Sequence, residues 1–285
     1  ASSVAALLEG VGSGAVSNQV NDVEHSTLLL LIGTNPTANH PVAATWFKNA
    51  AKRGTKIVLC DPRKTEISKH AWRVMQFRPD TDVAMLNAMI HTIVEEGLVD
   101  QTFIQNRANN YEALKEHIKA YSPEAMAPIC GIPPESLREI AREFATTKSA
   151  MVLWGMGASQ HVHGTDNARC LITLVSITGQ IGKPGSGLHP LRGQNNVQGA
   201  SDAGLIPMMF PNYQRVDDPE VNAWFEKFWG MPLDKKPGYT VVEVIYKIEA
   251  PDSDPDKIRG MYIEGENPAM SDPDLNHARH AIAIA

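Results

Sequence analysis

The chain has 285 residues, 43% of them hydrophobic, and a formal net charge of -6 at pH 7. This length can supply one large or two ordinary domains with a real core. The acidic balance, with Lys and Arg spread singly, excludes a typical nucleic-acid-binding surface. No apolar run approaches the roughly 20 residues that span a bilayer, so we expect no membrane span. Three cysteines without CxxC spacing argue against a zinc site, an iron–sulfur cluster or a disulfide framework within the chain and favour a reducing, cytoplasmic compartment.

Both ends indicate a segment of a longer polypeptide, since the chain lacks an initiator Met and residues 277–285 break off inside a helical or extended pattern. Residues 1–23 are small and rich in glycine, and they predict a flexible loop with a short helix. Gly10, Gly12 and Gly14 do not complete a GxGxxG motif, which argues against a plain Rossmann NAD-binding module.

The first clear unit is the apolar run 27–32, followed by a turn beginning at Gly33 and a periodic segment at 42–52. This pattern predicts a buried parallel strand, a tight turn and a helix. The turn contains Gly33, Thr34, Asn35 and Pro36. It would lie at the carboxyl end of the strand, where open α/β sheets place ligands and free backbone N–H groups meet phosphate.

A second strand is predicted at 56–60, and it ends at Asp61. Asp61 is well placed for ribose hydroxyls and Arg63 or Lys64 for phosphate, while a helix cap at Asp61 is the alternative. A third short strand is predicted at 74–77, followed by a turn at 78–82 and a helix through about residue 96. A carboxylate in that turn could bind a base, or Thr81 or Asp82 could cap the helix.

The middle of the chain carries helical periodicity at 101–118, 123–129 and 134–146, to which we assign no chemistry. A further strand is predicted at 149–154, and glycines at 155 and 157 would let the backbone approach a flat ligand whose polar edge Gln160 contacts. The pair His161 and His163 suggests a metal, but the spacing suits a strand and no third ligand is near.

After a helix at 165–178 and a turn-rich crossover at 179–187 comes the polar stretch 191–200. It contains one cation, Arg192, four side-chain amides and two glycines, and almost nothing to bury. A guanidinium suits a small carboxylate, and amides both donate and accept, so we interpret the stretch as a site, with a solvated loop as the alternative.

The last third predicts an aromatic amphipathic helix at 219–229 and a strand at 257–263. That strand ends in Gly265, Glu266, Asn267 and Pro268, which repeats the Gly-x-Asn-Pro pattern beginning at Gly33. Two such turns suggest two related nucleotide-holding halves.

Taken together and in this order, the motifs 33–40, 60–64, 154–160 and 191–199 resemble the catalytic subunit of a metal-dependent formate dehydrogenase. This enzyme belongs to the molybdopterin oxidoreductase family of the dimethyl sulfoxide reductase type. The resemblance implies a parallel-sheet, Rossmann-like α/β domain at 1–192 and part of a second, pseudosymmetric α/β domain at 193–285. Molybdenum or tungsten would lie between two molybdopterin guanine dinucleotides.

The resemblance also implies roles for individual residues. The phosphates and nucleoside of one dinucleotide would be bound by Gly33, Thr34, Asn35, Pro36, Asn39 and His40. Its guanosine end would contact Cys60, Asp61, Arg63, Lys64, Asp80 and Asp82. The pterin near the metal would contact Met156, Gly157 and Gln160. The second dinucleotide would contact Gly265, Glu266 and Asn267. Arg192 would bind the carboxylate of formate, with Gln194 beside the metal and pterin.

The implied reaction is the two-electron oxidation of formate to carbon dioxide, or its reverse. Electrons would leave through iron–sulfur clusters outside this segment to iron–sulfur and flavin subunits. Residues 200–207 and 210–214 resemble the corresponding segments of the NAD-linked complexes. The family's metal-ligating cysteine or selenocysteine and its catalytic histidine would precede residue 1, so the segment holds no metal ligand and should be inactive alone. Nitrate reduction on the same fold, or a cofactor-free scaffold subunit of a respiratory complex, remains the alternative.

Overall fold

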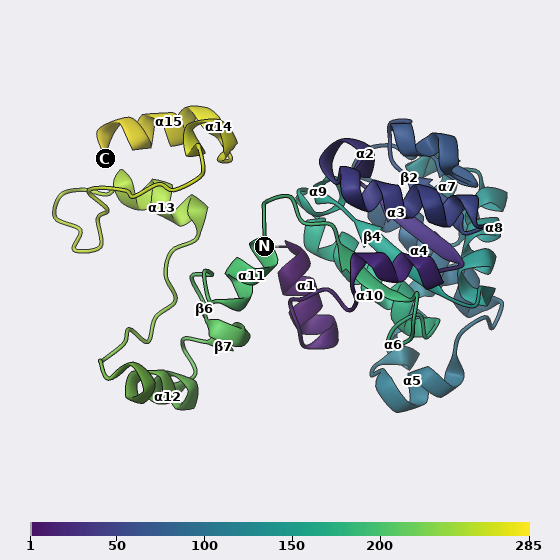
Figure 1. Cartoon of the computed structure of the whole chain (residues 1–285), viewed down its shortest axis with the longest axis horizontal. Coiled ribbons are helices and arrows are strands. Elements are labelled where there is room, and N and C mark those ends of the chain that lie inside the picture. The colour runs from purple at the N-terminus through teal and green to yellow at the C-terminus, as the bar shows by residue number, and fades with distance from the viewer. Residues whose placement is uncertain (1) are drawn as a thin grey trace. The chain divides into compact units, whose positions relative to one another are not determined.

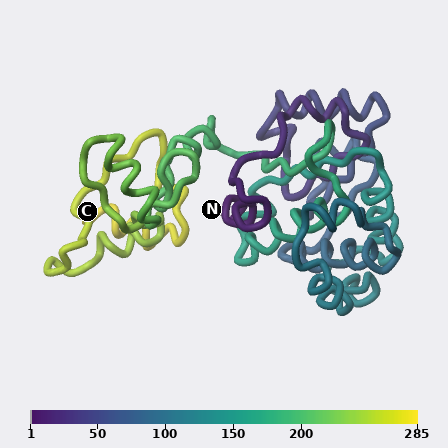
Figure 2. The backbone as a smooth tube through the Cα atoms, turned by 90° about the horizontal axis from the view of Figure 1, so that it is seen from below, coloured from purple at the N-terminus to yellow at the C-terminus, as the bar shows by residue number. Residues whose placement is uncertain are grey.

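A computed structural model describes residues 2–285 and divides the chain into two compact units, one ending at Val197 and one from Gln198 to Ala285. The sequence suggested a boundary at residue 192, five residues earlier than this division. Figures 1 and 2 follow the backbone by colour, with the first unit in purple to green and the second in green to yellow. We describe each unit by itself.

The first unit is built on a five-stranded parallel sheet with the order β3-β2-β1-β4-β5. The strands are β1 (Leu28–Ile32), β2 (Lys56–Cys60), β3 (Arg73–Met75), β4 (Ala150–Trp154) and β5 (Gly187–Pro190). Every residue of β1 and β4 is buried. Continuous apolar runs form such strands because helices cover both faces of a parallel sheet. The predicted α/β fold with a parallel sheet is thereby confirmed.

Alternate residues of the central strand face two separate hydrophobic clusters, as the pleat of a strand requires. Leu28, Leu30 and Ile32 join the larger cluster, and Leu29 and Leu31 join the smaller one. The larger cluster packs against α1 (Ser2–Val11), α4 (Asp82–Glu95), α7 (Pro123–Cys130), α8 (Pro134–Thr146) and α10 (Gly164–Ile177). The smaller cluster packs against η1 (Val20–His25), α3 (Pro41–Lys52) and η2 (Glu66–His70).

The helical stretch expected at 101–118 consists of separate elements. They are α5 (Gln101–Arg107), α6 (Tyr111–His117) and the short turn η3 (Ile118–Ala120). Asp100 caps α5 by accepting a hydrogen bond from the amide of Phe103 at 2.8 Å. Asn110 interrupts the helical path because it adopts a left-handed conformation with φ 61°. Two further one-turn helices, α2 (Pro36–Asn39) and α9 (Met156–Ser159), follow β1 and β4 directly.

The second unit consists mainly of short helices. They are α11 (Val197–Asp202), which begins at the last residue of the first unit, η4 (Pro211–Tyr213), α12 (Pro219–Trp229), α13 (Val241–Ile248), α14 (Pro268–Ser271) and α15 (Leu275–Ile284). Strands β6 (Met209–Phe210) and β7 (Gln214–Arg215) form a small antiparallel pair. The helix predicted at 219–229 is confirmed, with Asp218 as its N-cap and Gly230 as its left-handed C-cap.

The strand predicted at 257–263 is wrong, because these residues form neither a strand nor a helix. A strand requires a hydrogen-bonded neighbour, and no other described segment pairs with this one. Tyr262 is accordingly 90% exposed. Within residues 2–285, no helix combines the length and the apolar character needed to cross a bilayer.

Candidate functional site

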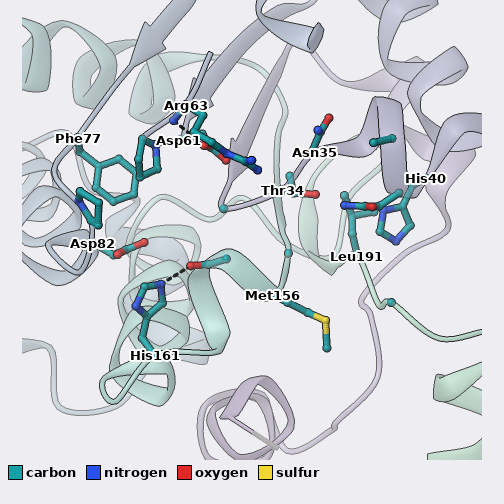
Figure 3. A pocket seen from close by; sticks show the side chains of 18 of the residues that line it. Thr34, Asn35, His40, Asp61, Arg63, Phe77, Asp82, Met156, His161 and Leu191 are labelled. Atoms are coloured by element: carbon teal, nitrogen blue, oxygen red, sulfur yellow. Dashed lines mark hydrogen bonds between the residues drawn. The ribbon is translucent and has the colours of Figure 1, made fainter. Parts of the chain in front are cut away.

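A cavity of about 840 Å³ opens at the carboxyl ends of the strands of the first unit (Figure 3). The chain visits β1, β2 and β3 on one side of the sheet and then crosses to β4 and β5 on the other. The order therefore reverses between β1 and β4, which is where open α/β sheets bind their ligands. The lining residues come from the turns after all five strands: Gly33, Thr34, Asn35, Ala38, Asn39, His40, Asp61, Pro62, Arg63, Phe77, Pro79, Asp80, Asp82, Gly155, Met156, Gly157, His161, Leu191 and Gly193.

The main chain forms the floor of this cavity where the turns after β1 and β4 meet. The amide of Gly155 donates to the carbonyl of Ile32 at 3.1 Å, and the amide of Gly157 donates to the carbonyl of Gly33 at 3.0 Å. Gly33 has φ +55°, and a Cβ there would lie 2.3 Å from the amide nitrogen of Ala158. Any side chain at this point would force the two turns apart, so glycine is required for the approach.

Three carboxylates lie at the end of the cavity formed by the turns after β2 and β3. In Figure 3, Asp61 and Arg63 lie beside each other, and Asp82 lies near Phe77 and His161. The side chain of Asp61 accepts a hydrogen bond from the amide of Arg63 at 2.8 Å, and no helix begins there, so the alternative of a helix cap at Asp61 is wrong. Asp80, which is exposed, adopts a left-handed backbone with φ 63°.

Asp82 opens α4 and is 1% exposed, yet neither of its carboxylate oxygens accepts a hydrogen bond from another described residue. Burial raises the pKa of Asp82 to about 6, and the charges of Asp80 and Asp61 add to the rise. Burial also raises the pKa of Asp61. A buried acceptor without a donor is costly, so this carboxylate is suited to a ligand that brings N–H groups.

His161 completes this end of the cavity. Its Nε2 donates to the carbonyl of Gly157 at 2.5 Å, and its Nδ1 lies 3.3 Å from a carboxylate oxygen of Asp80. The sequence singled out His161 only as part of a pair with His163, for which it did not favour a metal; His163 lies 3.8 Å from Asp166. Among residues 2–285, no three His, Cys, Asp or Glu side chains converge as a metal site would require. The four-residue spacing from Gly157 across the one-turn helix α9 is the signal that could have placed His161 in the cavity.

Arg192 and Gln194 line a smaller cavity of about 140 Å³, together with Trp154 and Ser3. Met156 and Gly193 line both cavities, so the two adjoin. The guanidinium of Arg192 donates to the carbonyl of Gly14 through Nη2. A guanidinium has five N–H donors, so donors remain for a small anion.

Several residues expected at the site do not line either cavity. Pro36 is buried in α2, Cys60 is buried in β2, where burial raises the pKa of its thiol, and Lys64 and Gln160 are exposed. Residues 265–267 belong to the second unit. Conversely, the sequence did not single out Pro62, Phe77 and Pro79 as cavity residues, whereas Ala38, Leu191 and Gly193 lie in segments that were expected at a site.

The repeated Gly-x-Asn-Pro turn has nearly the same backbone at both places. Gly33 and Gly265 have φ +55° and +69°, and Asn35 and Asn267 have φ/ψ of -117°/78° and -128°/83°. A four-residue helix follows each asparagine, namely α2 and α14. The sequence repeat is therefore also a structural repeat.

A parallel α/β sheet with a polar cavity at its switch point defines a nucleotide-binding type of domain. The family model for Molybdopterin oxidoreductase matches residues 2–283, and the chain belongs to that family, as the sequence motifs predicted. This family supports a molybdenum or tungsten molybdopterin cofactor.

Several curated relatives are named as formate dehydrogenases. The chain is 42% identical over 271 residues to the F420-dependent formate dehydrogenase subunit alpha of Methanocaldococcus jannaschii, covering 95% of this chain and 39% of the relative. It is 39% identical over 280 residues to Formate dehydrogenase H of Escherichia coli, covering 98% of this chain and 38% of the relative. The chain thus spans less than half the length of these relatives.

A solved structure also resembles the fold. Acetylene Hydratase from Pelobacter acetylenicus matches with a TM-score of 0.60 and 28% identity over 65% of this chain and 25% of that one. The resemblance supports the α/β architecture described above.

The residues of the larger cavity fit a bulky, polar cofactor. The buried atoms Asn35 Oδ1, His40 Nδ1 and both carboxylate oxygens of Asp82 have no partner from another described residue. All three residues line the cavity, whose floor of glycines leaves the backbone accessible. Such unpaired polar atoms are expected where a ligand completes the hydrogen bonding.

Proposed function

We propose that this chain is the central segment of a formate dehydrogenase catalytic subunit, which oxidises formate to carbon dioxide or catalyses the reverse reaction. The observation that carries the proposal is the small cavity holding Arg192 and Gln194 directly beside the large cofactor-sized cavity. The names of the relatives, which are formate dehydrogenase alpha subunits, support this assignment.

The cofactor in this proposal is a bis(molybdopterin guanine dinucleotide) centre of molybdenum or tungsten. One dinucleotide would lie in the cavity of the domain at 1–192, with its guanine at the carboxylates of Asp61 and Asp82. Guanine presents two adjacent kinds of N–H donor, a ring amide and an amine, and carboxylates accept from both. The second would contact the turn at Gly265, Glu266 and Asn267 in the partial domain at 193–285, whose backbone matches that of the first turn.

The protein's contribution to catalysis is to bind and orient formate. Arg192 would hold the carboxylate with its planar fork of donors, and Gln194 would donate a further hydrogen bond beside it. The carbon–hydrogen bond of formate breaks, and the products are carbon dioxide, one proton and two electrons. The molybdopterin centre, when bound, accepts those two electrons. Trp154, Pro190 and Leu191 would contribute apolar walls beside the anion.

Electrons would leave through iron–sulfur clusters outside this chain to iron–sulfur and flavin subunits, in a cytoplasmic, NAD-linked complex. The name of the Methanocaldococcus jannaschii relative indicates F420 as its electron carrier, so carriers differ among relatives. Purified intact enzyme assayed with NAD and with F420 would identify the carrier used here.

Composition and activity of the full-length enzyme test the proposal together. We expect molybdenum or tungsten with two guanine nucleotides per metal, and formate oxidation without nitrate reduction. Nitrate reduction without formate oxidation would identify the protein as a nitrate reductase of this family. Absence of metal and pterin from the intact protein would favour a cofactor-free scaffold subunit.

A further inference from the structure

His40 connects the turn after β1 to the loop that carries Arg192. It lies between α2 and α3, and its Nε2 is 2.6 Å from the carbonyl oxygen of Arg192, a residue 152 positions later. A carbonyl oxygen can only accept, so Nε2 must carry the hydrogen. The imidazole therefore donates to the main chain of the loop.

This hydrogen bond lies where regular structure ends. The amide of Leu191 donates to the carbonyl of Trp154 at 2.8 Å and closes the pairing of β5 with β4. Beyond it, residues 193–196 are exposed and form neither strand nor helix. The hydrogen bond to the carbonyl of Arg192 therefore fixes the main chain at the start of the loop. The contact of the Arg192 guanidinium with Gly14 holds the side chain as well.

The other ring nitrogen of His40, Nδ1, has no hydrogen-bond partner from the described residues. This nitrogen is buried, and His40 lines the larger cavity. Figure 3 shows His40 and Leu191 on the same side of that cavity, opposite Asp82 and His161. One ring therefore contacts the Arg192 loop with one nitrogen and borders the cofactor cavity with the other.

We propose that His40 is a positioning residue for Arg192, which it serves by holding the main chain of the loop at the edge of the cofactor cavity. This role rests on the proposed function of Arg192 in binding formate. It is distinct from a contact between His40 and the cofactor, because the hydrogen bond joins two parts of this chain.

Three variants of the full-length enzyme separate the hydrogen bond from packing. Glutamine places its amide nitrogen near the position of Nε2, whereas asparagine reaches only as far as Nδ1 and alanine donates nothing. We expect His40→Ala and His40→Asn to raise the KM for formate about three- to tenfold, the worth of one hydrogen bond, with a smaller change in kcat. His40→Gln should restore a KM closer to that of the wild type.

A second measurement does not depend on turnover. Trypsin cleaves after arginine, and the carbonyl of the Arg192–Gly193 peptide bond is the one that His40 holds. We expect cleavage at this bond in the native full-length protein to be several-fold faster in His40→Ala and His40→Asn than in wild type and His40→Gln. Because the contact involves only this chain, the measurement applies with or without bound cofactor.

The results distinguish this role from the proposed function. If Arg192→Lys leaves the KM for formate unchanged, the proposed function fails. If Arg192→Lys raises KM while His40→Ala keeps wild-type KM and wild-type cleavage, the positioning role is overturned. Equal behaviour of His40→Gln and His40→Ala would overturn the hydrogen bond as its cause.

Discussion

Gly157 and Gly33 are in direct main-chain contact: the amide of Gly157 donates to the carbonyl of Gly33 at 3.0 Å, and a Cβ on Gly157 would lie 2.6 Å from that oxygen. The contact joins the turns after β1 and β4, at the point where the sheet order reverses. The shape of the cavity floor therefore depends on the absence of side chains at two positions.

Replacing Gly33 should damage both the fold and the cavity. Alanine at φ +55° is strained, and its Cβ would meet the amide nitrogen of Ala158 at 2.3 Å. We expect Gly33→Ala to lower the free energy of unfolding by about 2–4 kcal/mol and to reduce cofactor content. Gly97→Ala is the matched control, since Gly97 has φ +68° with nothing within 4 Å of a Cβ. If both variants lose the same free energy of unfolding, backbone strain alone explains the loss and the contact with Ala158 contributes nothing.

Asp82 should make the cofactor-free protein less stable at neutral pH. Its pKa of about 6 in the fold exceeds the ordinary 3.8, so the folded state binds the proton more tightly between about pH 4 and 6. Stability therefore falls as the pH rises through this window and stays lower above it. We expect Asp82→Asn to be more stable than wild type at pH 7, by on the order of 1–2 kcal/mol after solvent screening, and the difference to vanish near pH 4.

The same substitution should weaken cofactor retention, because asparagine replaces a carboxylate acceptor with a mixed donor and acceptor. Thermal unfolding at the two pH values and nucleotide content after purification measure the two effects. A variant that is less stable than wild type at pH 7 would contradict the assignment of an unpaired buried carboxylate.

His189 should act in the opposite direction in an overlapping pH window. It is 6% exposed near the end of β5, and burial lowers its pKa from 6.5 to about 4. Between these values the unfolded chain binds the proton more readily, so stability is lost as the pH falls from about 6.5 towards 4. We expect this loss to be on the order of 2–3 kcal/mol and to be absent from His189→Gln. Unfolding of both proteins at pH 7 and pH 5 tests this, and parallel slopes would refute it.

Arg192→Lys should raise the KM for formate at least tenfold in the full-length enzyme while metal and pterin content stay unchanged. Lysine keeps the charge but loses the planar fork that binds a carboxylate through two N–H groups. Arg53→Lys is the control, because Arg53 is exposed and lies 3.7 Å from Glu24 in a surface ion pair. Steady-state kinetics with formate measure the effect, and an unchanged KM would remove Arg192 from the substrate site.

The sequence predicted the strands whose apolar runs are unbroken. Residues 28–32 and 150–154 are buried throughout, so composition alone identifies them. Strand β5 was not predicted, because Gly187, Leu188, His189 and Pro190 show neither alternation nor β-branched residues. The segment 257–263 has the composition of a strand, but composition cannot tell whether a neighbouring strand exists to pair with it.

The site was predicted best where residues lie in the turns after strands. Asp61 and Asp82 reach one cavity because parallel strands bring their carboxyl ends to one edge. Lys64 was expected to contact phosphate and Gln160 the polar edge of a flat ligand, but both lie further along their turns and are exposed. His161 reaches the cavity only through the tight turn of α9, which a search by composition does not reveal.

The two Gly-x-Asn-Pro turns share dihedral angles although Thr34 is buried and Glu266 is exposed. What the two turns share is thus a path of the peptide backbone, which does not depend on the residue at the second position. A superposition of the main-chain atoms alone would therefore detect this similarity even at positions such as 34 and 266, where the residue types differ.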